Sequence, residues 1–170
     1  MKKHYAAIFT LFFTSLVYSQ ISINEVSYYS SPKFVEISGP TGFNLSGWSL
    51  NFFQGAGGVS TSIMNLTGSM PSIAILEGGK TVLAIDTPDL HSGNPKGGYV
   101  MLLNGTTPVQ LLAYQGAAAG SFGEQISSVN IGSATSPNSI QLNETGWTGA
   151  PSSKDQINVG QTLSVVKNNI

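Results

Sequence analysis

Two glutamates stand inside the most strand-like part of this chain. Glu25 lies in the run ISINEVSYY, and Glu36 lies in the run KFVEISGP. Two carboxylates held close together can act as a general acid and a general base when their surroundings separate their pKa values. They can also contribute oxygen ligands to calcium. A third role is structural, because a carboxylate in a strand can accept backbone N–H bonds.

We favour the structural role for both glutamates. Apolar residues alternate along ISINEVSYY, but the alternation shifts at Asn24 and Glu25, which predicts a β-bulge there. We expect the two runs to form neighbouring strands whose carboxylates accept hydrogen bonds from the bulge or a loop. A calcium site built from Glu25, Glu36 or Asp86 remains an alternative, although the sequence has no calcium-loop spacing.

His91 is the other residue that could do chemistry. With Asp86, Asp89 and one of the many serines it could form a catalytic triad of a small hydrolase. The chain has no Gly-x-Ser-x-Gly turn for a nucleophile, and it has no cysteine to complete a zinc site. We therefore predict no catalytic residues, no metal ligands and no cofactor, and we expect His91 to lie in a solvated loop.

The first nineteen residues have the layout of a secretory signal peptide. A basic start, an apolar run over residues 6–17 and the small-residue pattern Val17-Tyr18-Ser19 precede Gln20. The run of about a dozen residues is shorter than the roughly 20 that span a bilayer. We expect residues 1–19 to be removed and residues 20–170 to be exported as one domain without a membrane span. Its destination would be the cell surface, the periplasm or the medium.

Charge and cysteine content exclude several classes of function. Two of the seven basic residues and none of the eight acidic residues precede Gln20, so the exported chain would carry a net charge of about −3. The chain contains no arginine. A protein that binds nucleic acid needs a basic surface, and we therefore predict no nucleic-acid partner. Without cysteine, the domain must rely on its core rather than on disulfides.

The elements that must position these residues are short strands. Runs rich in Val, Ile, Leu and aromatic residues alternate with clusters of Gly, Pro, Asn and Ser, which is typical of an all-β sandwich. Asn104-Gly105 predicts a hairpin, with residues 106–108 making its connection longer than two residues. We expect surface loops at residues 86–98 and 115–138. The predicted strands are residues 21–28, 34–38, 48–53, 59–66, 81–86, 99–103, 109–114 and 139–142, with an edge strand at 162–166.

The aromatic residues are expected to serve the core. Trp48 precedes alternating apolar residues and should fill the sandwich, whereas the exposure of Trp147 is open. In the pairs Tyr28-Tyr29 and Phe52-Phe53, strand geometry turns one ring of each pair outward, where it could stack on a sugar or be covered by a loop. Four Asn-x-Ser/Thr sequons begin at Asn44, Asn65, Asn104 and Asn143.

Several segments together resemble the lamin-tail domain as found in exported bacterial proteins. ISINEVSYY, KFVEISGP and FNLSGWSL are similar to its opening strands. GGYVMLLNGTTPVQLLAYQG is similar to its hairpin, and NSIQLNETGWTGAPSSKDQINVGQTL to its closing section. The chain departs from the family pattern at Leu142, where Arg is common, and at Lys154-Asp155, where Pro-Gly is usual. The resemblance implies an immunoglobulin-like antiparallel β-sandwich, and bacterial members are mostly exported modules, some attached to nucleases or other hydrolases.

The sequence therefore favours an exported, non-catalytic β-sandwich module for binding, adhesion or assembly. Its partner would be a protein or a glycan that the sequence does not identify. The alternatives are a small hydrolase or calcium-dependent module that uses loop carboxylates and His91, or an accessory partner of a secreted nuclease.

Overall fold

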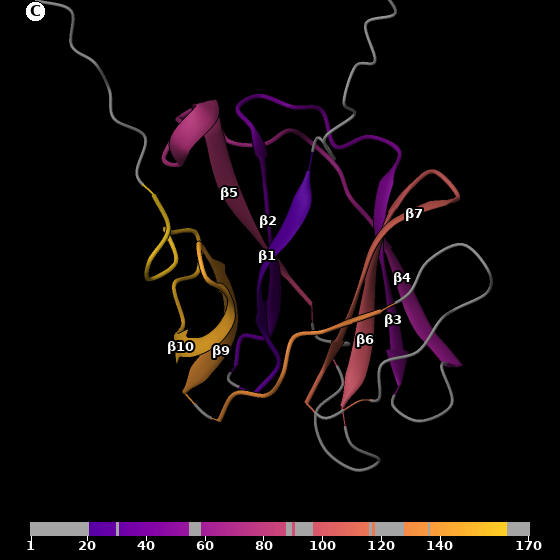
Figure 1. The fold of residues 1–170 in the computed structure, drawn as a ribbon. Helices are drawn as coiled ribbons and strands as arrows, with labels where there is room; N and C mark the ends of the chain where they lie inside the picture. Colours follow the sequence, from indigo (N-terminus) through magenta and orange to yellow (C-terminus); the bar gives the residue numbers. More distant parts are fainter. Residues whose placement is uncertain are drawn as a thin grey trace, which may run out of the picture.

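The structure is a computed structural model that describes residues 21–29, 31–54, 59–87, 90, 97–115, 117, 128–135 and 137–162. Within these residues, ten strands form two sheets that pack face to face (Figure 1). The predicted all-β sandwich is confirmed. The described part contains no α-helix, only a 3-10 turn at Glu77–Gly79, and so it offers no helix that could cross a membrane.

The first sheet has the strand order β10-β9-β1-β2-β5, and all its pairs are antiparallel. Its strands are β1 (Ser22–Ser27), β2 (Phe34–Pro40), β5 (Lys80–Asp86), β9 (Asn138–Asn143) and β10 (Gly146–Pro151). The first and last described parts of the chain therefore meet in one sheet, where β1 pairs with β9.

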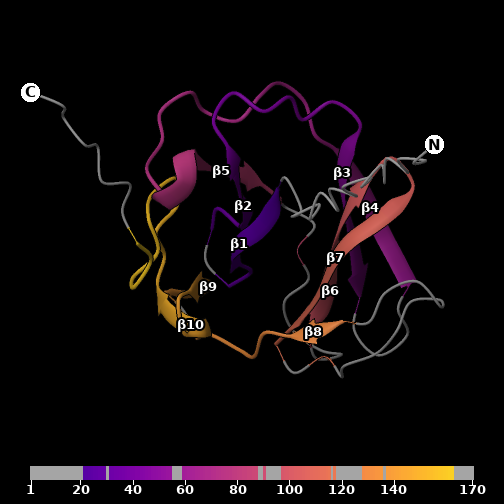
Figure 2. The same ribbon diagram turned by 45° about the horizontal axis from the view of Figure 1, so that its top comes forward.

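The second sheet has the strand order β4-β3-β6-β7-β8. Its pairs are antiparallel except for the short parallel pair of β7 and β8, which lies at the sheet edge (Figure 2). Its strands are β3 (Trp48–Gln54), β4 (Val59–Asn65), β6 (Gly98–Asn104), β7 (Thr107–Tyr114) and β8 (Val129–Asn130).

The main core lies between the sheets because each strand turns alternate residues inward. Ile23, Val26, Val35 and Ile37 of the first sheet belong to one buried cluster with Trp48 and other residues of the second sheet. Trp48 is thus a core residue, as predicted, and Trp147 packs against the same cluster while half-buried.

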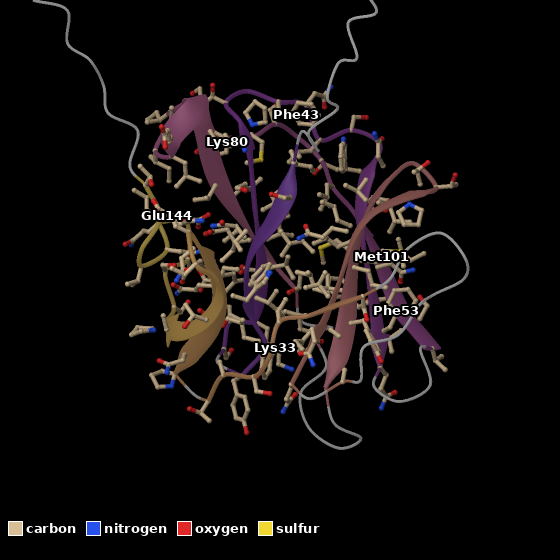
Figure 3. The ribbon with its side chains drawn as sticks, viewed as in Figure 1. Lys33, Phe43, Phe53, Lys80, Met101 and Glu144 are labelled. Carbon is tan, nitrogen blue, oxygen red and sulfur yellow. The ribbon has the colours of Figure 1, made fainter. Side chains whose placement is uncertain are left out.

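The two adjacent aromatic pairs alternate as expected. Tyr28 is buried and Tyr29 is exposed. Phe52 enters the main core, whereas Phe53 belongs to a second buried cluster with Tyr99, Met101, Leu111, Ala113 and Ala117. This second cluster lies on the face of the second sheet that points away from the first, where Phe53 and Met101 are seen in Figure 3. The outward ring of this pair is therefore covered.

The predicted bulge in the first strand is confirmed. Ile23 pairs with Ile37 and Glu25 pairs with Glu36, so Asn24 is an extra residue without an opposite partner. The predicted hairpin at Asn104-Gly105 is also present, but the expectation of a longer connection was wrong. β7 already begins at Thr107. A register shift between Leu102 and Leu103 of β6 accommodates Pro108 within β7.

Strands β8 and β10 were not predicted from the sequence. Gly146–Pro151 has two glycines and a terminal proline, so its local preference for a strand is weak. It forms a strand because it pairs with all six residues of β9. Of the predicted edge strand at 162–166, residue 162 is not in a strand and the rest lies outside the described residues.

Candidate functional site

Glu25 and Glu36 lie side by side on the outer face of the first sheet. They are register partners on β1 and β2, and both side chains are 0% exposed. Their neighbours Val26 and Val35 point into the main core, so the two carboxylates point the other way. A face that points away from the sandwich would normally be wet, and the burial of two acids there requires a cover.

The cover is residues 152–162, which we call the C-terminal strap. It follows β10 and lies on the side of the first sheet away from the second sheet (Figure 1, yellow). Six of its residues contact the sheet through hydrogen bonds: Ser153, Lys154, Asp155, Asn158, Val159 and Gln161. The strap thus closes a polar layer over the middle of the sheet.

Glu25 accepts hydrogen bonds at both carboxylate oxygens. Its Oε1 atom accepts from Ser139 Oγ at 2.5 Å and from the backbone N–H of Ser153 at 3.1 Å. Its Oε2 atom accepts from Ser153 Oγ at 2.7 Å. The Glu25 carboxylate therefore joins strand β9 to the strap.

Glu36 has one N–H donor at each oxygen. The Asn24 side-chain amide donates to Oε1 at 2.8 Å, and the backbone N–H of Asp155 donates to Oε2 at 2.8 Å. The extra residue of the bulge therefore supplies a donor through its side chain. The backbone donors to both carboxylates come from the strap and not from the bulge, so of the two sources expected from the sequence, a bulge or a loop, it is the loop that supplies them.

Asn158 is the one fully buried residue of the strap. Its side-chain amide donates to the carbonyl oxygens of Asn24 and Leu142, each at 2.9 Å. Its Oδ1 atom lies 2.7 Å from Ser153 Oγ, so Asn158 and Glu25 share the single proton of that hydroxyl. The two Asn158 donor bonds satisfy backbone carbonyls on β1 and β9. Gln161 adds a bond from its side-chain amide to Asn24 Oδ1.

Burial dominates the electrostatics of Glu36. Loss of solvent raises the pKa of Glu36 to about 8, the hydrogen bond from Asn24 opposes this rise, and the neighbouring charge of Glu25 adds to it. The described residues contain one ion pair, between Lys154 and Asp86 at 2.7 Å, and it lies at the exposed side of the strap. No lysine of the described chain is ion-paired with either glutamate.

The geometry of the pair does not favour acid–base chemistry. Glu25 and Glu36 are both 0% exposed, so all four of their carboxylate oxygens are enclosed. Ser139, which donates to Glu25, is itself fully buried. A substrate cannot reach a serine or a carboxylate in that position without displacing the strap. Within the described ranges, no group of three or more His, Cys, Asp or Glu side chains could hold a metal ion.

Two recesses lie near the surface of the described structure. A polar groove of about 260 Å³ is lined by residues at one end of the first sheet and by the end of the strap. Its lining includes Ser22, Ser38, Lys80 and Glu144, of which Figure 3 labels the last two. An apolar recess of about 210 Å³ opens between the edges of the two sheets, where Met64, Leu83 and Ile85 are half-buried. Neither contains a histidine.

The other residues considered for chemistry are dispersed. Asp86 is exposed and paired with Lys154, away from the enclosed oxygens of Glu25. His91 and Asp89 lie outside the described residues, so the triad hypothesis is untested. Of the sequon asparagines, Asn44, Asn65 and Asn104 are exposed and Asn143 is half-buried.

Sequence reasoning identified the two acids but missed most of their partners. Ser139, Gln141 and Ser153 lie in polar stretches where nothing distinguishes them from the many other Ser and Gln residues of the chain. One signal was available: Ser139 and Gln141 alternate with the apolar residues of β9, so they had to share one face of that strand.

Comparison of the chain with protein-family models, with curated proteins and with solved structures gave no match in any of the three. The resemblance to the lamin-tail domain therefore rests on the sequence segments quoted above.

Proposed function

We propose that this chain is an exported, non-catalytic β-sandwich module that binds, adheres or assembles outside the cytoplasm. The observation that supports this proposal is that the two buried glutamates accept hydrogen bonds from the strap. Glu25 and Glu36 are the buried acidic residues of the described chain, and both hold the strap to the sheet through hydrogen bonds. Their carboxylates make structural hydrogen bonds in an enclosed layer and do not form an acid–base pair open to a substrate.

The proposed ligand class is a protein or a glycan. The polar groove beside Lys80 and Glu144 is the described recess that offers charged and hydroxyl groups to such a ligand. Hydroxyl-rich ligands need several such groups in one place, because each hydrogen bond lost to desolvation must be replaced. This makes the groove the first surface to mutate.

The test has two parts. Mass spectrometry of the protein recovered from the exported fraction should give a mass that begins at Gln20, and a retained Met1 in that fraction would contradict export by cleavage. The full chain should then be screened for binding to arrayed glycans and to surface proteins. A ligand recovered unchanged in mass supports a binding module, and a cleaved ligand supports a hydrolase instead.

The groove is tested by a matched pair of variants. Lys80→Ala removes a charge from the groove wall, and Lys33→Ala removes one from the position just before β2, outside the groove. Loss of binding by at least tenfold in the first variant alone would support the groove. Equal losses in both, or in neither, would place the ligand on another surface.

A further inference from the structure

The C-terminal strap differs from the rest of the sandwich in how it is held. None of its side chains belongs to either apolar cluster, and Val159 is 65% exposed. Its attachment consists of polar contacts: hydrogen bonds to Asn24, Glu25, Glu36, Gln141 and the backbone of β9 and β5, and the Lys154–Asp86 ion pair. A segment that buries little apolar surface opens at lower free-energy cost than the core beneath it.

The strap is held by two carboxyl groups, those of Glu25 and Glu36, which lie opposite each other on neighbouring strands. Side chains directly opposite on antiparallel strands lie about 5 Å apart at their Cβ atoms, and like charges there repel. Asp155 of the strap adds a third carboxylate, which lies near Glu36. The strap's own cation, Lys154, is paired with Asp86 of β5, and strands β9 and β10 carry no charged residue.

We propose that the strap is a pH-controlled latch over the Glu25–Glu36 pair, closed while Glu36 holds a proton and released when Glu36 ionises. In the closed state, a proton on Glu36 leaves a lone pair at each oxygen for the donors from Asn24 and Asp155.

Opening of the strap lowers the free-energy cost of ionising Glu36. Ionised Glu36 would bind the Asp155 N–H more strongly, but it would remain buried and would face both Glu25 and the Asp155 side chain. Burial is the largest effect on Glu36 and raises its pKa to about 8. Opening the strap lets water reach Glu36, so ionisation and opening favour each other.

Release also changes the surface of the module. It uncovers the polar side chains of Ser139 and Gln141 on the face of the first sheet. It also frees the backbone N–H of Ala84, which donates to Asp155 Oδ1 at 2.7 Å and lies on edge strand β5. An edge strand with free backbone groups can pair with another strand, so the latch would control whether this edge is available.

The experiment is hydrogen exchange of the full chain between pH 6.5 and pH 9.5, corrected for the intrinsic pH dependence of exchange. The amides of Ser153 and Asp155 report the strap, and the amides of β6 report the core. If opening returns Glu36 to its ordinary pKa, the opening constant of the strap should rise by about 30-fold over this range. We expect a rise of at least tenfold at the strap, and at every pH the strap amides should open at a lower free energy than the β6 amides, which report unfolding of the whole sandwich.

Three variants separate the latch from general loosening. Glu36→Gln removes the titrating group and should abolish the pH dependence of strap opening. Asp155→Asn keeps the acceptor for Ala84 and removes a charge that raises the pKa of Glu36, so the rise in strap opening should be smaller and should level off at a lower pH. Glu144→Gln, in the exposed turn between β9 and β10, should behave like the wild type.

Two results would overturn the proposal. One is strap protection in the wild type that changes less than threefold between the two pH values. The other is an opening free energy of the strap amides equal to that of the β6 amides at each pH, which would mean that the strap opens only when the whole sandwich unfolds. If Glu36→Gln does not fold, the comparison of strap and core in the wild type still decides the question.

Discussion

Glu25 and Glu36 lie directly opposite each other across β1 and β2, and both are sealed beneath the C-terminal strap. Their carboxylates accept hydrogen bonds from Ser153 and Asp155, more than a hundred residues further along the chain. This pair therefore ties the start of the domain to its end. The predictions below test the pair, the strap and the core that carries them.

Replacing either glutamate should destabilise the fold, and a chelator should not change the melting temperature of the wild type or of either variant. Glu25→Ala and Glu36→Ala each leave buried donors without partners, at a cost of about 1–3 kcal/mol. Thermal melting with and without a chelator measures this cost. Glu144→Ala, in an exposed turn, is the control and should melt like the wild type. A chelator that lowers the melting temperature of the wild type but not of the Glu25 and Glu36 variants would show a calcium site instead.

Stability should fall as the pH rises from about 4.5 to about 8. Because the pKa of Glu36 is raised to about 8 in the folded protein, the folded state holds a proton that the unfolded state releases above pH 4.5. The free energy of unfolding should therefore decrease across this window, by on the order of 5 kcal/mol, and become flat above it. Urea denaturation at several pH values measures the slope. The slope should be absent in Glu36→Gln, and an unchanged slope in that variant would assign the effect to another group.

Asn158→Ala should loosen the strap more than any exposed asparagine variant. The change removes two donors to backbone carbonyls and one acceptor for Ser153, all buried or nearly so. We expect a loss of about 1–3 kcal/mol and faster exchange of the Ser153 and Asp155 amides. Asn65→Ala, at an exposed position on β4, is the control. Equal effects of both variants on strap exchange would contradict the anchoring role of Asn158.

Gly98→Ala should strain the second sheet. A Cβ atom at Gly98 would lie 2.6 Å from Tyr114 Oη and 2.7 Å from the carbonyl oxygen of Phe53. The ring or the backbone must move, at a cost of about 1–3 kcal/mol. Gly149→Ala on β10 is the matched control, because its nearest contact would be 3.7 Å. Equal melting temperatures for the two variants would show that β6 yields more easily than its packing indicates.

Much of the sandwich could be predicted from local sequence. The alternation of apolar residues in β1, β3 and β6 sets which face is buried, because successive side chains of a strand point to opposite faces. The shift at Asn24 predicted the bulge for the same reason. Strand β10 could not be predicted in this way, since a segment with two glycines becomes a strand only through its pairing with β9.

The sequence by itself determined that Glu25 and Glu36 belong to strands and that their carboxylates need donors. It could not say which donors, because hydrogen-bond partners of a buried side chain depend on distance in space and not along the chain. Only the tertiary structure brought Ser153, Asp155 and Asn158 over the outer face of the first sheet. Desolvation is likewise a property of the whole fold, and the raised pKa of Glu36 follows from the strap that covers it.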